Sequence, residues 1–164
     1  MISKNTVCLL FLLYLFFCLF AIDHPRLYSL MGIIVYCMYD LIASPHPRID
    51  MQFHHWLVVI ISVKGIYKAH IPWSFIKAFL ETEFSTPFLV LKEYGVRHWA
   101  NSLLFVCSFV YFRIYKLGIV LFQNSHPLYW YEYGLVYSLY LLNWYWMIKI
   151  FQWVHRKIYF YSFP

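Results

Sequence analysis

The residues of this chain that could do chemistry are ionisable side chains set inside long apolar stretches. A charged group in an apolar membrane segment is costly, and by default it faces a cavity or a partner. A histidine near a carboxylate can take up a proton or activate a nucleophile, which would support acid–base or group-transfer chemistry. The groups placed in this way are Asp40, Asp50, His54, His55, Glu81, Glu83, Arg113 and Lys116.

Four of these side chains are expected to lie at a similar depth and to form a candidate catalytic site. Asp40 and His54 are equally far along the chain from the proline-containing turn expected between them. Across the next expected turn, His55 and Glu83 differ in depth by only about 6 Å, at about 1.5 Å per helical residue. We therefore predict His54 beside Asp40 and His55 nearer Glu83. Adjacent residues on a helix point about 100° apart, so the two histidines should meet different acids.

Asp50, Glu81 and Arg113 are candidate binding residues, each with an alternative interpretation. Asp50 lies at the start of an apolar stretch. Its alternative role is that of a solvated residue at a helix start, where the positive end of the helix dipole stabilises a carboxylate. Glu81 has the alternative of facing lipid headgroups. For Arg113 and Lys116 we favour long side chains that reach the membrane surface.

Pro87 predicts a break beside Glu83. A proline inside a helix removes the hydrogen bond to the carbonyl four residues earlier, which here belongs to Glu83. The hydroxyls of Ser85 and Thr86 can partly satisfy the opened backbone. Such a break is tolerated in a membrane only where protein or a cavity covers it, so the apolar segment should be kinked at its acid.

The histidine spacing argues against a metal centre. Di-iron lipid desaturases and hydroxylases carry H-x-x-H-H and H-x-x-x-H boxes, whereas the adjacent pair here is His54-His55 and no box spacing occurs. We expect no metal and no other cofactor. The formal net charge of +6 comes from basic residues scattered singly between apolar runs. This pattern predicts contacts with anionic headgroups rather than with nucleic acid.

Composition places these residues in a membrane. Apolar residues make up 63% of the 164-residue chain and charged residues 12%, whereas a soluble domain carries roughly 25% charge. A membrane-crossing helix needs about 20 apolar residues. We predict an all-α integral membrane protein, a single domain over residues 1–164, with about six transmembrane helices around a central cavity. The expected spans are residues 7–22, 27–43, 53–69, 73–91, 99–122 and 128–154.

The sequence leaves the role of the first span, the orientation in the membrane and the oligomeric state undetermined. Residues 7–22 also resemble the core of a signal peptide. Basic residues flank the spans on both sides, so the positive-inside rule does not orient the chain, and the oligomeric state is not predicted. Cysteines occur within apolar runs and without a C-x-x-C pair, which predicts buried thiols at Cys8, Cys18, Cys37 and Cys107.

Several short motifs together resemble the TLC-domain family, which includes ceramide synthases and translocation-associated membrane proteins. Tyr39-Asp40-Leu41 resembles the Y-D-L that ends one span, and Asp50-x-x-x-His54-His55 resembles the D-x-x-x-H-H that opens the next. The run from Glu83 to Leu89 is similar to the E-x-S-T-P-F-L of the branch outside the ceramide synthases. Arg113 and the aromatic run 143–146 resemble features of the closing spans.

The resemblance implies six helices around a lipid-accessible cavity in the endoplasmic reticulum or another endomembrane. It leaves two functions open. One is a protein that binds, senses or regulates membrane lipids without catalysis. The other is an acyl-CoA-dependent acyltransferase, in which a histidine acts as general base or acyl carrier. Ceramide synthases carry two adjacent aspartates on the helix after the histidines, whereas this chain has Glu81 and Glu83 separated by Thr82. A proton or ion pathway would use the same buried groups.

Overall fold

The computed structural model describes residues 4–21, 25–43, 49–68, 71–93, 95, 99–123 and 128–162. These residues form helices and no strand, which confirms the prediction of an all-helical chain with six helical segments. The turn expected at 44–48 and the predicted span ends at residues 22 and 69 lie outside the described residues. The elements are α1 (Lys4–Ala21), α2 (Pro25–Ala43), α3 (Ile49–Tyr67), α4 (Trp73–Glu81), η1 (Thr82–Ser85), α5 (Thr86–Glu93), α6 (Trp99–Phe109), η2 (Val110–Lys116), α7 (Leu117–Gln123) and α8 (Trp130–Ser162).

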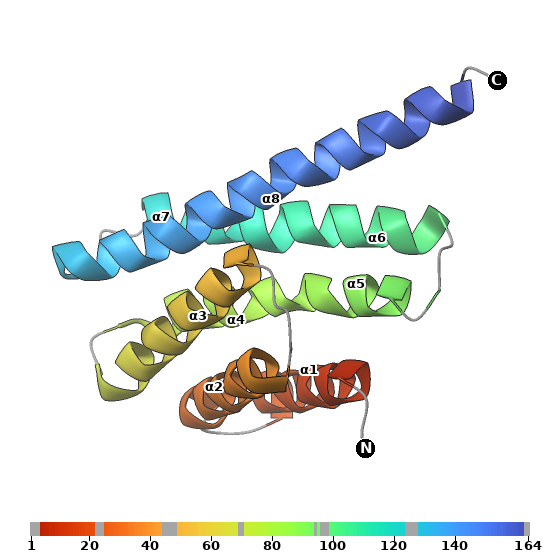
Figure 1. Cartoon of the computed structure of the whole chain (residues 1–164). Helices are drawn as coiled ribbons and strands as arrows, with labels where there is room; N and C mark the ends of the chain where they lie inside the picture. Colours follow the sequence, from red (N-terminus) through yellow and green to blue (C-terminus); the bar gives the residue numbers. More distant parts are fainter. Residues whose placement is uncertain are drawn as a thin grey trace.

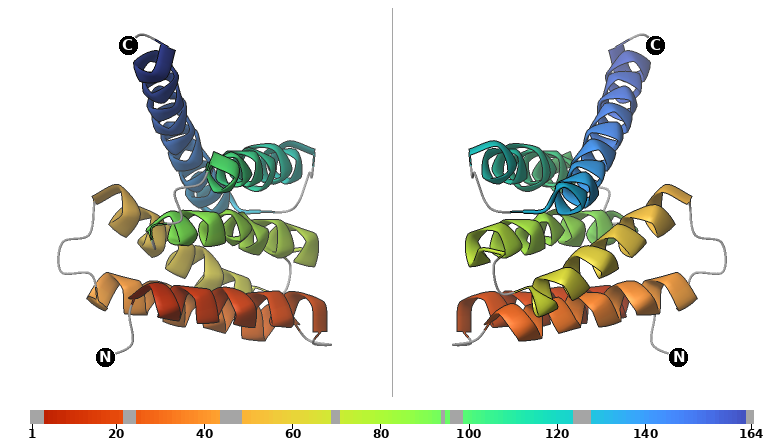
Figure 2. Two further views of the ribbon diagram at one scale, coloured as in Figure 1. Left: turned by 90° about the vertical axis from the view of Figure 1, so that its right-hand side faces the viewer. Right: turned by 90° about the vertical axis from the view of Figure 1, so that its left-hand side faces the viewer.

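The helices lie in stacked layers (Figures 1 and 2). The α1–α2 pair forms one outer layer, and α3 with the α4–η1–α5 segment lies above it. The α6–η2–α7 segment and α8 cover the opposite side, and α8 packs on α3 while α6 packs on α5. In Figure 1, α1 begins and α8 ends towards the same side of the molecule.

The apolar core runs through all the layers. Its fully buried members come from α1, α2, α3, α4, α7 and α8, and they form one contiguous cluster. Burial of such side chains stabilises a fold by about 1.5–3 kcal/mol each in water. The central members are Leu15, Leu30, Val58, Phe79, Leu117 and Leu139.

The fourth helical segment is interrupted beside Glu83, as Pro87 predicts. Residues Thr82–Ser85 form a 3₁₀ turn instead of α-helix. The carbonyl of Glu83, which Pro87 cannot bond, accepts the backbone N–H of Thr86 instead. The hydroxyl of Ser85 donates to the Thr82 carbonyl at 3.1 Å. The polar groups at the break therefore form their hydrogen bonds within the helical segment itself.

The fifth segment contains a π-helical turn that the sequence did not predict. It covers Val110–Lys116 and joins α6 to α7 without a break in direction. A π turn inserts an extra residue into an α-helix, and such turns occur frequently at functional sites. Here it carries Arg113 at its middle.

The last helix is longer than the predicted span. It continues through residues 155–157 to Ser162, because charged side chains end an apolar stretch without ending a helix. At about 1.5 Å per residue its 33 residues are about 50 Å long. Figure 1 shows its end extending past the other helices.

Apolar side chains also cover much of the outer surface. Leu13 on α1 is 68% exposed and Ile42 on α2 is 79% exposed. One of the described helical segments, Trp99–Phe122, is long and apolar enough to cross a membrane, with 24 residues and a mean hydropathy of 1.8. One of the six predicted spans therefore meets this criterion, and the prediction of about six membrane-crossing helices stays a prediction. The prediction that all four cysteines are buried is wrong for Cys107, which is exposed. An apolar run that faces outwards looks the same in sequence as one that faces the core.

Candidate functional site

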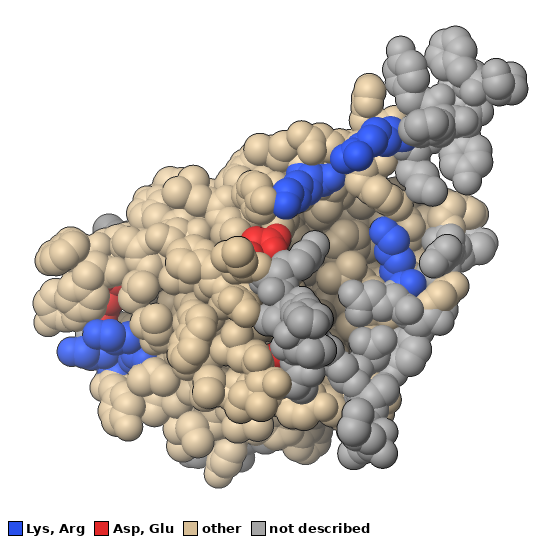
Figure 3. All heavy atoms as spheres, in the orientation of Figure 1, with Lys and Arg blue, Asp and Glu red and all other residues tan. Residues whose placement is uncertain are grey.

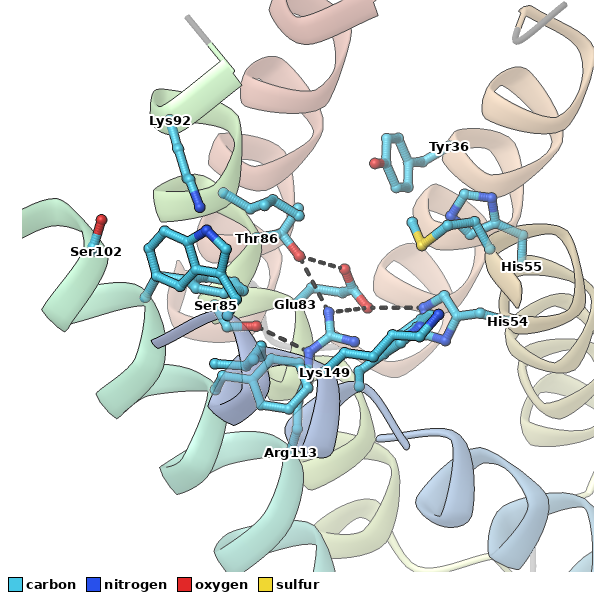
Figure 4. A pocket seen from close by; sticks show the side chains of 17 residues that line it. Tyr36, His54, His55, Glu83, Ser85, Thr86, Lys92, Ser102, Arg113 and Lys149 are labelled. Carbon is cyan, nitrogen blue, oxygen red and sulfur yellow. Dashed lines mark hydrogen bonds and ion pairs between the residues drawn. The ribbon is translucent and has the colours of Figure 1, made fainter. Parts of the chain in front are cut away.

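The four predicted catalytic side chains meet in the interior, in two acid–histidine pairs. Asp40, His54, His55 and Glu83 are each no more than 6% exposed. His55 Nδ1 lies 3.2 Å from Asp40 Oδ2, and His54 Nε2 lies 3.7 Å from Glu83 Oε1 (Figure 4). The prediction that the histidines meet different acids is therefore confirmed.

The predicted choice of partners is wrong, because the pairing is the reverse. One residue along a helix changes the depth by only about 1.5 Å but the direction by about 100°. Direction therefore decides the partner: His55 points to α2 and Asp40, and His54 points to Glu83 in η1. Counting residues from a turn gives depth and carries no information on direction.

Arg113 is buried against Glu83, so the interpretation that it reaches the membrane surface is wrong. Its Nε donates to the Thr82 carbonyl at 3.0 Å and to Ser85 Oγ at 2.9 Å. Its Nη2 lies 3.5 Å from Glu83 Oε1, and Nη1 donates to Asn143 Oδ1 at 3.4 Å. Thr86 donates to the second Glu83 oxygen at 2.9 Å. The negative charge of the buried Glu83 carboxylate and the positive charge of the buried Arg113 guanidinium thus balance each other.

Glu81 and Lys116 form a second, separate ion pair. Glu81 is buried, and its carboxylate contacts the ammonium group of Lys116. Neither residue lines the cavity that contains Glu83. The headgroup interpretation of Glu81 is wrong, because its carboxylate is buried between α4 and η2. The Lys116 side chain is 35% exposed, so its surface interpretation stays a prediction. Glu81 therefore has no place in the site.

Asp50 contributes indirectly, through an aromatic side chain. It lies in the first turn of α3, and Trp146 Nε1 donates to its Oδ2 at 2.8 Å. The Trp146 ring packs on His54 with 5.0 Å between ring centroids. It also lies against the guanidinium of Arg113, 5.8 Å from the centroid. Asp50 therefore positions the aromatic ring that covers the histidine and the arginine.

Several of these side chains line a cavity of about 250 Å³. The buried end contains His54, His55, Glu83 and Arg113, and Figure 4 shows Lys92 and Ser102 at the opposite side from the histidines. Between them the walls are apolar and aromatic. In Figure 3 the molecule is hollowed below α8, and basic side chains lie along α8 and across the hollow from it. The apolar and outer lining residues are Leu89, Phe105, Phe109, Trp146, Ile150, Lys92, Lys149 and Trp153.

Most of the outer wall was missed at the sequence level. Glu83, Thr86, Leu89 and Lys92 follow one another at every third position, which places them on one helix face. That spacing could have predicted from the sequence that α5 lines the cavity. Lys149 carries no comparable signal, because it is one of several basic residues on a long aromatic helix.

The chemistry open to this arrangement centres on His54. Its Nε2 is directed at Glu83, and its buried Nδ1 has no hydrogen-bond partner among the described residues. An imidazole held by a carboxylate on one nitrogen can accept a proton or attack a carbonyl with the other. Within the described ranges, no three His, Cys, Asp or Glu residues are grouped so that they could hold a metal ion.

In comparisons with protein families, curated proteins and solved structures, nothing matches this chain. The TLC resemblance therefore depends on the motif residues themselves, and it stays a prediction.

Proposed function

We propose that the chain is a multi-pass membrane protein that binds a membrane lipid in the cavity between α3, α5, α6 and α8. The proposal includes six membrane-crossing segments and an endomembrane location. It makes lipid binding, sensing or regulation the function, with membrane lipids as the partners.

The distribution of polar and apolar side chains supports a membrane environment. Charged and polar groups such as Asp40, Glu83 and Arg113 are buried, while large apolar side chains on every long helix are exposed. A soluble monomer rarely exposes apolar patches of more than a few hundred Å². In lipid, the same surface is favourable and the buried ionisable groups are those expected to serve function.

The cavity is the observation that carries lipid binding. It joins an ionic, hydrogen-bonded interior to walls of Leu89, Phe105 and Phe109. Pockets for small amphiphiles combine apolar walls with a few fixed polar groups in this way. The motif residues that resemble the TLC family also converge on this region from five separate helical segments, although up to 106 positions separate them in the sequence (Asp40 to Trp146).

An acyltransferase is the second candidate, and the geometry of His54 favours it. The imidazole lines the cavity, contacts Glu83 through one nitrogen and keeps the other without a partner in the described part of the chain. Acyl transfer from acyl-CoA would use it as general base on an attacking amine, or as nucleophile forming an acyl-imidazole.

Native mass spectrometry of the full chain in a neutral detergent tests the proposal. We expect one lipid per protein, recovered intact by extraction. A covalent acyl adduct mapped to His54 would favour the acyltransferase instead. A protein that carries no lipid, before or after incubation with extracted membrane lipids, would contradict both functions.

A further inference from the structure

Two lysines at the end of α3 lie against a stacked pair of tyrosine rings where α8 begins. Lys64 Nζ lies 4.7 Å from the centroid of the Tyr131 ring, and Lys68 Nζ lies 5.6 Å from that of Tyr129. The two rings are nearly parallel, with 5.6 Å between their centroids. Cation–π contacts fix a flexible lysine without removing its charge. The two rings therefore hold both ammonium groups at defined positions.

The helical spacing places these two positive charges one turn apart. Lys68 N donates to the Lys64 carbonyl at 2.9 Å, so the geometry of α3 continues to Lys68. Side chains four residues apart on a helix are neighbours, and like charges there repel each other. In the part of the chain that the structure describes, both ammonium groups contact tyrosine rings and neither forms an ion pair with a carboxylate. An anion that bound both lysines would remove the repulsion.

Arg26 adds a third positive charge at the end of α3. Its guanidinium donates to the carbonyls of Gly65 and Lys68 at 2.6 Å each and to the Ile71 carbonyl at 3.0 Å. The last carbonyls of a helix carry the negative end of its dipole and attract cations. Because Arg26 binds these carbonyls, they do not need the lysine side chains. In Figure 3, basic side chains gather at the side of the molecule where α8 begins.

Large aromatic side chains beside the lysines are exposed. Tyr67 is 81% exposed, Trp130 is 84% exposed and Tyr129 is 53% exposed. Tyrosine and tryptophan are enriched at the level of lipid headgroups, because their rings have an apolar body and a polar end. Basic groups between membrane helices at this level bind anionic headgroups. The aromatic residues therefore favour a lipid over a free anion as the partner of the lysines.

This lysine–tyrosine cluster is separate from the cavity, because none of its four residues lines the cavity. Lys64 follows His54 by ten residues on α3, which is about 15 Å along the helix axis. We propose that Lys64 and Lys68 bind the phosphate of an anionic phospholipid from the surrounding bilayer. This inference rests on the membrane location in the proposed function, and it does not require a ligand in the cavity.

A comparison of two phospholipids with identical acyl chains tests the charge of the headgroup. The full chain in neutral maltoside is incubated with phosphatidylglycerol or phosphatidylcholine, and bound lipid is counted by native mass spectrometry. We expect phosphatidylglycerol to bind about ten-fold more tightly, since each lysine near a membrane surface adds to the attraction of anionic lipid. Inorganic phosphate in excess should not displace it, because phosphate has no acyl chains to bury.

The paired variant Lys64→Gln with Lys68→Gln should remove the preference for phosphatidylglycerol. The matched control is Lys64→Arg with Lys68→Arg, which keeps both charges at the same positions and should keep the preference. A preference that survives in the glutamine pair, or equal binding of the two lipids by the unaltered protein, would overturn the proposed site. Displacement of phosphatidylglycerol by inorganic phosphate would overturn the lipid as its ligand.

His54→Ala separates this inference from the proposed function. It removes an imidazole that lines the cavity and should preserve the preference for phosphatidylglycerol. Loss of the preference in this variant would assign the anionic lipid to the cavity and overturn the lysine site. A preserved preference in a protein whose cavity residues Phe105 and Phe109 do not crosslink to a photoreactive lipid would support the lysine site and contradict the proposed cavity binding alone.

Discussion

At the scale of single residues, Arg113 determines which groups of the site remain open to a ligand. Its guanidinium contacts Glu83, Thr82, Ser85 and Asn143, so the carboxylate is balanced within the protein. His54 contacts the same carboxylate and still keeps a buried nitrogen without a hydrogen-bond partner in the described structure. We infer that a bound molecule contacts the His54 imidazole, which lines the cavity, rather than the balanced Glu83 carboxylate.

The two histidines should therefore respond differently to alanine. We expect His54→Ala to lower lipid occupancy at least ten-fold, because the cavity loses the imidazole that lines it beside Glu83. His55→Ala should instead cost about 1–3 kcal/mol of unfolding free energy, because buried Asp40 loses its imidazole partner at 3.2 Å. Bound lipid per protein and thermal unfolding in one detergent measure the two effects.

The exposed His155 on α8 provides the matched control. His155→Ala should change neither occupancy nor stability beyond about 0.5 kcal/mol. Equal loss of lipid in the His54 and His55 variants would contradict the division of roles.

At the scale of elements, the site depends on two irregular turns facing each other. The 3₁₀ turn η1 presents Glu83, and the π turn η2 presents Arg113. Ser85 joins them, because its hydroxyl donates to Thr82 within η1 and accepts from Arg113 Nε at 2.9 Å. Regular α-helix in either segment would rotate one of the charged side chains away from the other.

Ser85→Ala should accordingly destabilise the protein by about 1 kcal/mol, since it removes one buried hydrogen bond to a charged donor while Thr82 still accepts from Arg113. Ser138→Ala is the control, because its hydroxyl also bonds a backbone carbonyl of its own helix but is exposed. We expect the control to change the unfolding free energy by less than about 0.5 kcal/mol. Equal effects in chemical denaturation would show that η1 and η2 do not depend on this bond.

The sequence predicted one of the two turns for a clear physical reason. Pro87 lacks a backbone donor, so a break at Glu83 follows from covalent structure. No residue in 110–116 forces a π turn, and that turn is evident only where Arg113 packs against η1. The meeting of two acids with two histidines could likewise be predicted from depth. Their pairing could not, because the direction of a side chain depends on how the helices are rotated against one another.

At the scale of the whole molecule, the layers produce a cavity with an ionic, hydrogen-bonded interior and apolar walls. The helices α3, α5, α6 and α8 each supply a wall, so no single helix contains the site. The apolar runs and the polar, proline-containing turns between them were sufficient to predict the helices and their number. The position of the cavity could not be predicted in this way, because it depends on how α8 packs on α3.

Photo-crosslinking of a bound chain tests the central claim most directly. The full chain in lipid nanodiscs is irradiated with a single-chain fatty acid that carries a diazirine, and the crosslinked residues are mapped by mass spectrometry. We predict crosslinks at Phe105, Phe109 and Ile150, which line the cavity. Excess unlabelled fatty acid should abolish them. Crosslinks confined to Leu104 and Ile148, which are exposed on the same two helices, and unaffected by competitor would contradict lipid binding in the cavity.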